Sequence, residues 1–111
     1  MPENRELEIS KLIDLFDTMS VRARREGLLG IEDLMDEVQQ NPVARAGVQG
    51  IIDGYDFLII KERIKDEVAF QNLCAKVILA ACRDIQAGKE TEKVRANMVK
   101  VLPPQWRKQY A

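Results

Sequence analysis

The chain has 111 residues with a formal net charge of −1; 46% of its residues are hydrophobic, 32% are charged, and none is histidine. Its length fits one domain with a core of its own, and its composition is typical of a soluble helical protein and excludes a disordered one. The small net charge excludes a global field toward nucleic acid or membrane, and without histidine the familiar zinc sites and histidine-based acid–base catalysis are excluded.

Apolar residues at helical spacing predict an all-α, single-domain bundle of about five helices. The first two are amphipathic helices over residues 7–25 and 28–38, and the second keeps its acidic residues on the outer side. Gly27 lies between them and either ends the first helix or kinks it. The second helix must end before Pro42, because the residue that precedes a proline is pushed out of the helical conformation.

Asn41 and Pro42 predict the start of a short third helix. The asparagine side chain can cap this helix, and proline suits the first helical position because its missing N–H would have no partner there. Gly47 and Gly50 lie three residues apart and are expected to let another helix approach closely. Asp53-Gly54 closes the segment as a turn.

A long central helix is predicted over residues 56–87, either continuous or broken near residues 66–69. A second apolar stripe in its later half makes that half apolar on two sides, so we expect the other helices to pack against it. This second stripe consists of Phe70, Leu73, Val77 and Ala80. The main apolar stripe can be covered by other helices of the same chain or by a second copy of the chain, so the sequence leaves the oligomeric state, monomer or homo-oligomer, undecided. Its residues step by threes and fours: Phe57, Ile60, Ile64, Val68, Gln71, Ala75, Ile78, Cys82 and Ile85.

The C-terminal part is predicted to hold a last helix over residues 89–102 and then a basic aromatic tail over residues 103–111. In this tail Trp106 and Tyr110 lie four residues apart, so both rings share one face if the tail is helical. One interpretation is that they cover the apolar core from outside. The other is that Trp106, Arg107 and Tyr110 anchor the chain in a groove of a partner, because aromatic and arginine residues are enriched at interface hot spots.

Charge is unevenly distributed along the chain. Residues 93–111 contain five basic residues and no acidic one, so they carry +5 while residues 1–92 carry −6. A basic last helix complements its own C-terminal dipole and an acidic body. The alternative interpretation is a docking surface for an acidic partner.

No catalytic constellation is recognisable in the sequence. The glycines match neither a phosphate loop nor a dinucleotide fingerprint, and the acidic residues of the second helix lie on a solvated face. We therefore expect no enzyme activity, cofactor, metal or small-molecule substrate. The polar N-terminus and the lack of a membrane span predict a cytoplasmic protein. Nucleic-acid binding is not favoured, because the basic cluster at residues 22–25 is followed at once by Glu26.

The segment Ala23-Arg-Arg-Glu-Gly-Leu-Leu-Gly-Ile-Glu32, with Asn41-Pro42 and Gly47-Val-Gln-Gly-Ile-Ile-Asp-Gly54 after it, resembles the cytoplasmic loop of MotA-type flagellar stator subunits. The resemblance covers about residues 10–68. It implies contact with flagellar switch or stator components through charged residues that correspond here to Arg24 and Glu32, with Arg25 in the same box. On one continuous helix Arg24 and Glu32 would lie ~12 Å apart along the axis.

The chain also departs from that family. The stator loop is surrounded by membrane helices, whereas residues 7–19 are amphipathic here and the pattern is lost after Glu67. The resemblance therefore implies a soluble stand-alone relative, peripheral at the flagellar motor, that acts as a non-enzymatic protein–protein interaction module. The alternatives are a generic cytosolic helical adaptor or chaperone-like protein without a motility role, in which the box is only a helix junction, and a less favoured nucleic-acid-binding regulator.

Overall fold

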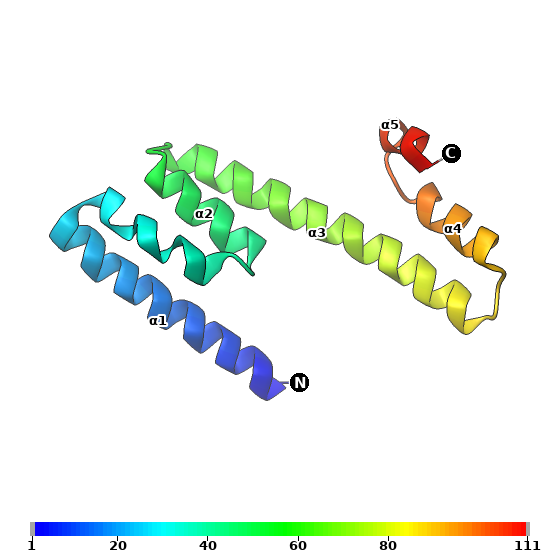
Figure 1. Ribbon diagram of the computed structural model, residues 1–111, viewed down its shortest axis with the longest axis horizontal. Helices are drawn as coiled ribbons and strands as arrows, with labels where there is room; N and C mark the ends of the chain where they lie inside the picture. Colours follow the sequence, from blue (N-terminus) through cyan, green and yellow to red (C-terminus); the bar gives the residue numbers. More distant parts are fainter. Residues whose placement is uncertain (1, 111) are drawn as a thin grey trace. The chain divides into compact units, whose positions relative to one another are not determined.

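The computed structural model describes residues 2–110, with side chains from Asn4 onward, and every regular element in this range is helical (Figure 1). This confirms the all-α class and the approximate number of helices. None of these helices is long and apolar enough to cross a membrane. The elements in chain order are α1 (Pro2–Glu26), the 3-10 helix η1 (Leu28–Val38), α2 (Pro42–Ile52), α3 (Phe57–Gln86), α4 (Thr91–Lys100), α5 (Pro104–Arg107) and the 3-10 helix η2 (Lys108–Tyr110).

The chain divides into two compact units, unit 1 (Met1–Lys65) and unit 2 (Asp66–Ala111). The division falls inside α3, which is continuous through residues 66–69. Because the two units share one uninterrupted helix, the division does not by itself separate the chain into independent domains. The single-domain organisation stays a prediction.

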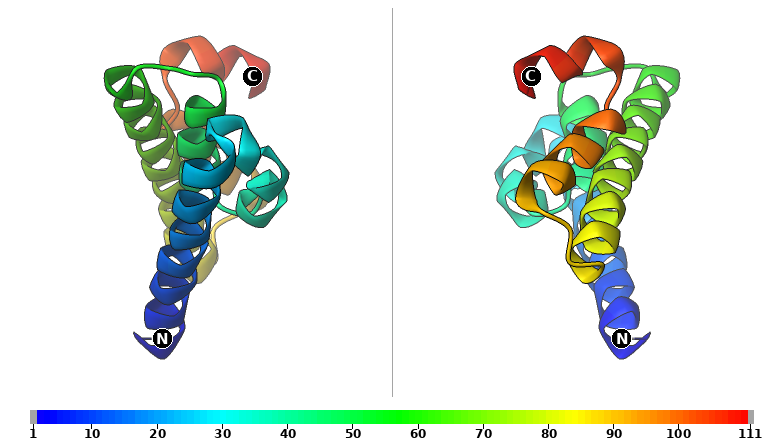
Figure 2. Two further views of the ribbon diagram at one scale, coloured as in Figure 1. Left: turned by 90° about the vertical axis from the view of Figure 1, so that its left-hand side faces the viewer. Right: turned by 90° about the vertical axis from the view of Figure 1, so that its right-hand side faces the viewer.

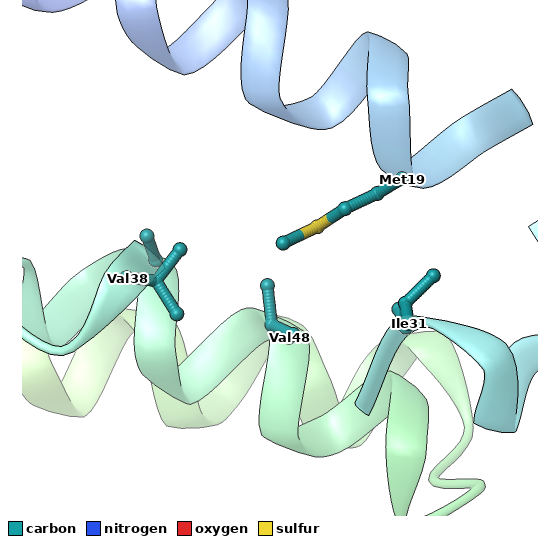
Figure 3. Close-up of a cluster of buried hydrophobic side chains, with 5 residues drawn as sticks. Met19, Ile31, Val38 and Val48 are labelled. Atoms are coloured by element: carbon teal, nitrogen blue, oxygen red, sulfur yellow. The ribbon is translucent and has the colours of Figure 1, made fainter. Parts of the chain in front are cut away.

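The main core lies in unit 1, where three amphipathic helices close their apolar faces on one another. Met19 of α1 points toward Val48 of α2, with Ile31 and Val38 of η1 on either side (Figure 3). Ala44 of α2 completes the buried cluster. Figure 1 shows η1 lying between α1 and α2, so this helix is covered on both of its flanks.

The later half of α3 is expected to receive the other helices; within unit 2 it contacts α4 through the Asp84–Asn97 hydrogen bond but buries few of its own residues. Only Ala80 and Asp84 are buried on α3. Its two apolar stripes face different directions, and α4 and α5 lie beside the second stripe and beside a single residue of the main stripe, Ile78. Along the main stripe, Val68, Ile78 and Ile85 remain exposed.

Residues 28–38 wind as a 3-10 helix, where the sequence predicts an α-helix. In this tighter winding side chains three residues apart lie one above the other. Ile31 and Leu34 therefore form one column and Met35 and Val38 form the next, which brings the two buried residues of η1 to the same core. As predicted, its acidic residues are exposed.

The start of α2 and its close packing against α3 follow the prediction. The side-chain oxygen of Asn41 accepts a hydrogen bond from the Ala44 N–H at 3.1 Å, and Pro42 is the first helical residue. A Cβ atom at Gly50 would lie 2.7 Å from Cγ1 of Ile60 on α3. Only a residue without a side chain allows the two helices to come this near.

Candidate functional site

Unit 2 contains an apolar groove of about 510 Å³ between the later part of α3, α4 and the C-terminal helices. Figure 2 shows the chain leaving α3, turning into α4 and continuing into the C-terminal helices, drawn in red. The second apolar stripe of α3 supplies one wall, and α4 supplies the other. We call this site the unit 2 groove; its lining is mainly Phe70, Leu73, Cys74, Val77 and Ile78 of α3, Met98 and Val99 of α4, and Leu102, Trp106 and Tyr110 beyond α4.

The two predicted aromatic anchors both lie in this groove. Trp106 packs against Phe70 with ring centroids 6.4 Å apart and planes tilted by 57°, a favourable aromatic geometry. Tyr110 follows on the 3-10 turn η2 and lines the same groove. Trp106 is 39% exposed and Tyr110 45% exposed, so the rings form an open wall and not a closed core.

Arg107 has a different position from its two aromatic neighbours. Its side chain donates hydrogen bonds to the backbone carbonyls of Leu102, at 3.0 Å, and Lys100, at 2.9 Å. Lys100 is the last residue of α4, where backbone carbonyls lack partners within the helix, and Leu102 lies just beyond it. Arg107 therefore fastens α5 to the end of α4 and holds Trp106 against the groove. A direct contact of Arg107 with a partner stays a prediction.

The lining of the unit 2 groove contains one charged side chain, which is basic. Arg95 of α4 is part of the lining. Lys93, Lys100 and Lys108 are exposed on the same C-terminal segment, which contains no acidic residue from position 93 onward. A ligand in this groove therefore meets apolar side chains and the positive charge of Arg95.

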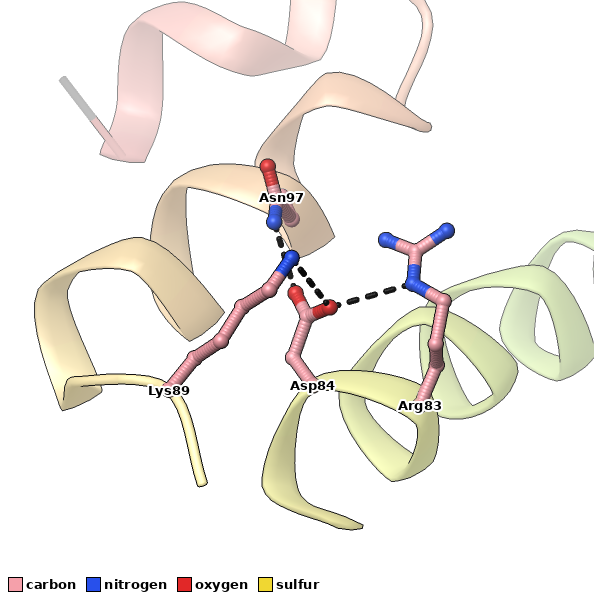
Figure 4. Close-up of polar contacts among 4 residues, drawn as sticks. All are labelled: Arg83, Asp84, Lys89 and Asn97. Atoms are coloured by element: carbon pink, nitrogen blue, oxygen red, sulfur yellow. Dashed lines mark hydrogen bonds and ion pairs between the residues drawn. The ribbon is translucent and has the colours of Figure 1, made fainter. Parts of the chain in front are cut away.

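A buried carboxylate, Asp84, fixes the turn that carries α4 to the groove (Figure 4). It accepts hydrogen bonds from Asn97 at 2.7 Å and from Arg83 at 3.0 Å, and the Lys89 ammonium lies 3.2 Å away. The hydrogen bond from Asn97, followed by that from Arg83, lowers the pKa of Asp84 to about 2, although burial acts in the opposite direction.

Asp84 was missed by sequence reasoning, although a signal was present. It is an acidic residue in the last turns of α3, where the helix dipole disfavours negative charge. It also shares the helical face of the apolar residues Val77 and Ala80. An acidic residue is disfavoured at such a position both by the helix dipole and by the apolar surroundings. Its presence therefore indicates hydrogen-bond donors that stabilise the carboxylate.

In unit 1 the charged box at residues 22–33 forms a helix junction. Gly27 ends α1 with a positive φ of 85°, a conformation that favours glycine, so the first of the two predicted roles is correct. One guanidinium nitrogen of Arg22 binds both carboxylate oxygens of Asp33, at 2.6 and 2.7 Å. At Gly30 a Cβ atom would lie 2.7 Å from Cβ of Glu26, so glycine allows η1 to pass close to the end of α1.

This junction separates the residues that the stator resemblance singles out. Arg24 and Arg25 lie in the last turn of α1, and Glu32 lies on η1, so the three are not on one continuous helix. All three are exposed. Glu32 borders a shallow hollow beside Arg22, and Arg25 borders a neighbouring one, whereas Arg24 lines neither.

Unit 1 has an apolar groove of its own, of about 530 Å³, between α1, α2 and the start of α3. Its walls include Phe16, Ile51, Phe57 and Ile60, and no charged residue lines it. Among residues 2–110 there is no group of three or more acidic or cysteine residues that could hold a metal ion. Comparisons of this chain with protein-family models, with curated proteins and with solved structures returned no match.

Proposed function

We propose that this chain is a non-enzymatic protein–protein interaction module that receives an apolar helix of a partner in the unit 2 groove. The observation that supports this proposal is the open apolar groove itself, with Trp106 and Tyr110 in its wall and Arg95 at its edge. These are the residue types that carry most of the binding energy at protein interfaces. Placing the apolar face of an amphipathic helix in such a groove is a recurrent mode of recognition.

The exposure of the groove gives the proposal its energetic basis. Trp106, Tyr110 and Phe70 all keep between a third and a half of their surface in contact with water. Covering apolar surface contributes about 25 cal/mol per Å² removed from water, and a partner helix would cover three aromatic rings together. The wall is also prepared in advance, because Arg107 and the Asp84 network hold α4 and α5 in place. Preorganisation lowers the cost of binding.

The proposal is tested with a synthetic amphipathic helix that has leucines at positions i, i+3, i+4 and i+7, glutamates beside them and no tryptophan. Trp106 is the single tryptophan of the chain, so its fluorescence reports directly on the groove. We expect a saturable spectral shift that is lost in Val99→Asp, which puts a charge in the wall. Leu79→Asp is the matched control, because Leu79 is 70% exposed and lies outside the groove. Equal responses of the two variants would contradict the proposal.

A role at the flagellar motor is a second proposal, supported by the resemblance of residues 10–68 to the stator loop. Arg24 and Glu32 are exposed, and neither joins an ion pair in the part of the chain that the structure describes, so both charges are available to a partner. We expect purified stator-loop or switch proteins to bind wild type and to lose binding to Arg24→Glu/Glu32→Lys, with circular dichroism confirming the fold. Unchanged binding, or none to wild type, would leave the generic adaptor as the better description.

A further inference from the structure

We propose that the occupant of the unit 2 groove is helix α1 of a second copy of this chain, whose residues Ile9, Ile13 and Phe16 enter the groove. This inference rests on the proposed function of the groove as a receptor for an apolar helix. The chain itself presents a helix, α1, whose apolar and acidic residues match this groove.

Helix α1 has an apolar stripe that the core of unit 1 does not cover. Met19 and its neighbours Leu12 and Leu15 face the core of unit 1. Ile9 and Ile13, four residues apart, lie one above the other on a different side of the helix and are 57% and 64% exposed. Phe16 extends the stripe toward the unit 1 groove and is itself exposed. Ile9 and Ile13 are therefore free to enter a groove on another molecule, together with the part of Phe16 that the unit 1 groove leaves exposed.

The lengths of stripe and groove agree. From Ile9 to Phe16 the stripe extends about 10 Å along α1, at ~1.5 Å per residue. Along α3 the groove wall extends from Phe70 to Ile78, which corresponds to about 12 Å. Three apolar side chains on two turns of helix thus meet a wall of the same length.

Charge complementarity selects α1 as the occupant. Beside the stripe, Glu6 and Asp17 lie on one flank of α1, and both are exposed. The groove offers one basic side chain, Arg95, in its lining. The same contrast holds for the two units, since unit 1 has thirteen acidic and nine basic residues and unit 2 has five acidic and eight basic. Opposite potentials steer two copies together and fix which surfaces meet.

A charge-swap experiment on the full chain tests this pairing. The first variant carries Glu6→Lys and Asp17→Lys on α1, and the second carries Arg95→Glu in the groove. Each variant alone brings like charges together, so we expect wild-type self-association in sedimentation velocity at low salt to weaken about two- to fivefold per lost charge pair. An equimolar mixture restores opposite charges between copies, and we expect association to return.

Two results would overturn the inference. One is a wild type that stays monomeric at every concentration and salt, and the other is a mixture that associates no better than its components. A peptide of residues 4–20 separates this failure from failure of the proposed function, with Trp106 fluorescence as the readout. If the synthetic amphipathic helix binds the groove and the peptide does not, only the identity of the occupant is wrong. If neither binds, the proposed function fails as well.

Discussion

Asp84 shows how one side chain determines the geometry of unit 2. Its carboxylate is completely buried at the end of α3, and its donors come from α3, the following turn and α4. A buried charge is tolerated only where hydrogen bonds and opposite charge replace water. The three donors therefore fix the direction in which α4 leaves the turn.

We predict that Asp84→Asn lowers the free energy of unfolding at neutral pH and that the difference from wild type shrinks in acid. The folded-state pKa of about 2 lies below the ordinary value of 3.8, so the ionised carboxylate stabilises the fold above pH 4. This contribution is lost as the pH falls from about 4 toward 2. Urea denaturation at pH 7, 4 and 2.5 measures the effect.

Glu92→Gln, on the exposed surface of α4, is the control for the Asp84 variant. Removing this charge is expected to change the unfolding free energy little at any of the three pH values. A difference between wild type and Asp84→Asn that stays constant from pH 7 to pH 2.5 would show that ionisation of Asp84 does not stabilise the fold.

The ion pair between Arg22 and Asp33 is expected to contribute little, despite its short distances. The carboxylate side chain is 71% exposed, and exposed pairs contribute about 0.2–1 kcal/mol because water screens them. A double-mutant cycle with Arg22→Ala and Asp33→Ala measures the coupling. A coupling energy well above this range would mean that the pair is more shielded in solution than its exposed fraction indicates.

At the scale of helices, Gly50 and Gly47 form a matched pair on α2. A methyl group at Gly50 meets Cγ1 of Ile60 at 2.7 Å, whereas one at Gly47 meets only the flexible end of Ile64 at 3.3 Å. Overpacking costs about 1–3 kcal/mol, and alanine gains ~1 kcal/mol over glycine inside a helix. We predict that Gly50→Ala destabilises the protein and that Gly47→Ala is neutral or slightly stabilising, as measured by thermal unfolding.

The Gly50 effect has an internal check. In an Ile60→Ala background the atom that blocks the new methyl group is gone, so Gly50→Ala is expected to lose its cost there. If the cost persists in this background, it arises from the α2 backbone and not from its contact with α3.

The sequence was sufficient to predict elements whose signals are local. The cap at Asn41, the end of α1 at Gly27 and the close approach at Gly50 each depend on a few neighbouring residues. The sequence was insufficient where two alternative packing arrangements have the same local pattern. The two stripes of α3 have the same helical period, and only the position of α4 decides which of them is covered. Likewise, the carbonyl partners of Arg107 depend on the position of α5 relative to the end of α4, which has no local sequence signal.

At the scale of the whole molecule, the two units have cores of different size. Unit 1 buries Met19, Ile31, Val38, Ala44 and Val48 in one cluster. In unit 2 the buried residues are Ala80, Val94 and the carboxylate Asp84. Because stability is distributed according to buried apolar contacts, unit 2 is expected to open at a lower free energy than unit 1.

We predict that unfolding followed by Trp106 fluorescence has its midpoint at a lower denaturant concentration than unfolding followed by far-ultraviolet circular dichroism. The fluorescence reports on unit 2 alone, and the dichroism averages the helices of both units. Coincident curves would instead indicate that α3 couples the two units into one cooperative transition.

The positions of the two cysteines allow occupancy of the unit 2 groove to be measured by thiol alkylation. Cys74 lies in the groove wall and is half-buried, whereas Cys82, two turns further along α3, is exposed and outside the lining. When a helix occupies the groove, alkylation of Cys74 is expected to slow while that of Cys82 continues at its own rate. The ratio of the two rates, read by mass spectrometry on the unaltered chain, would reveal an occupant inside a cell, where neither fluorescence nor sedimentation can be followed.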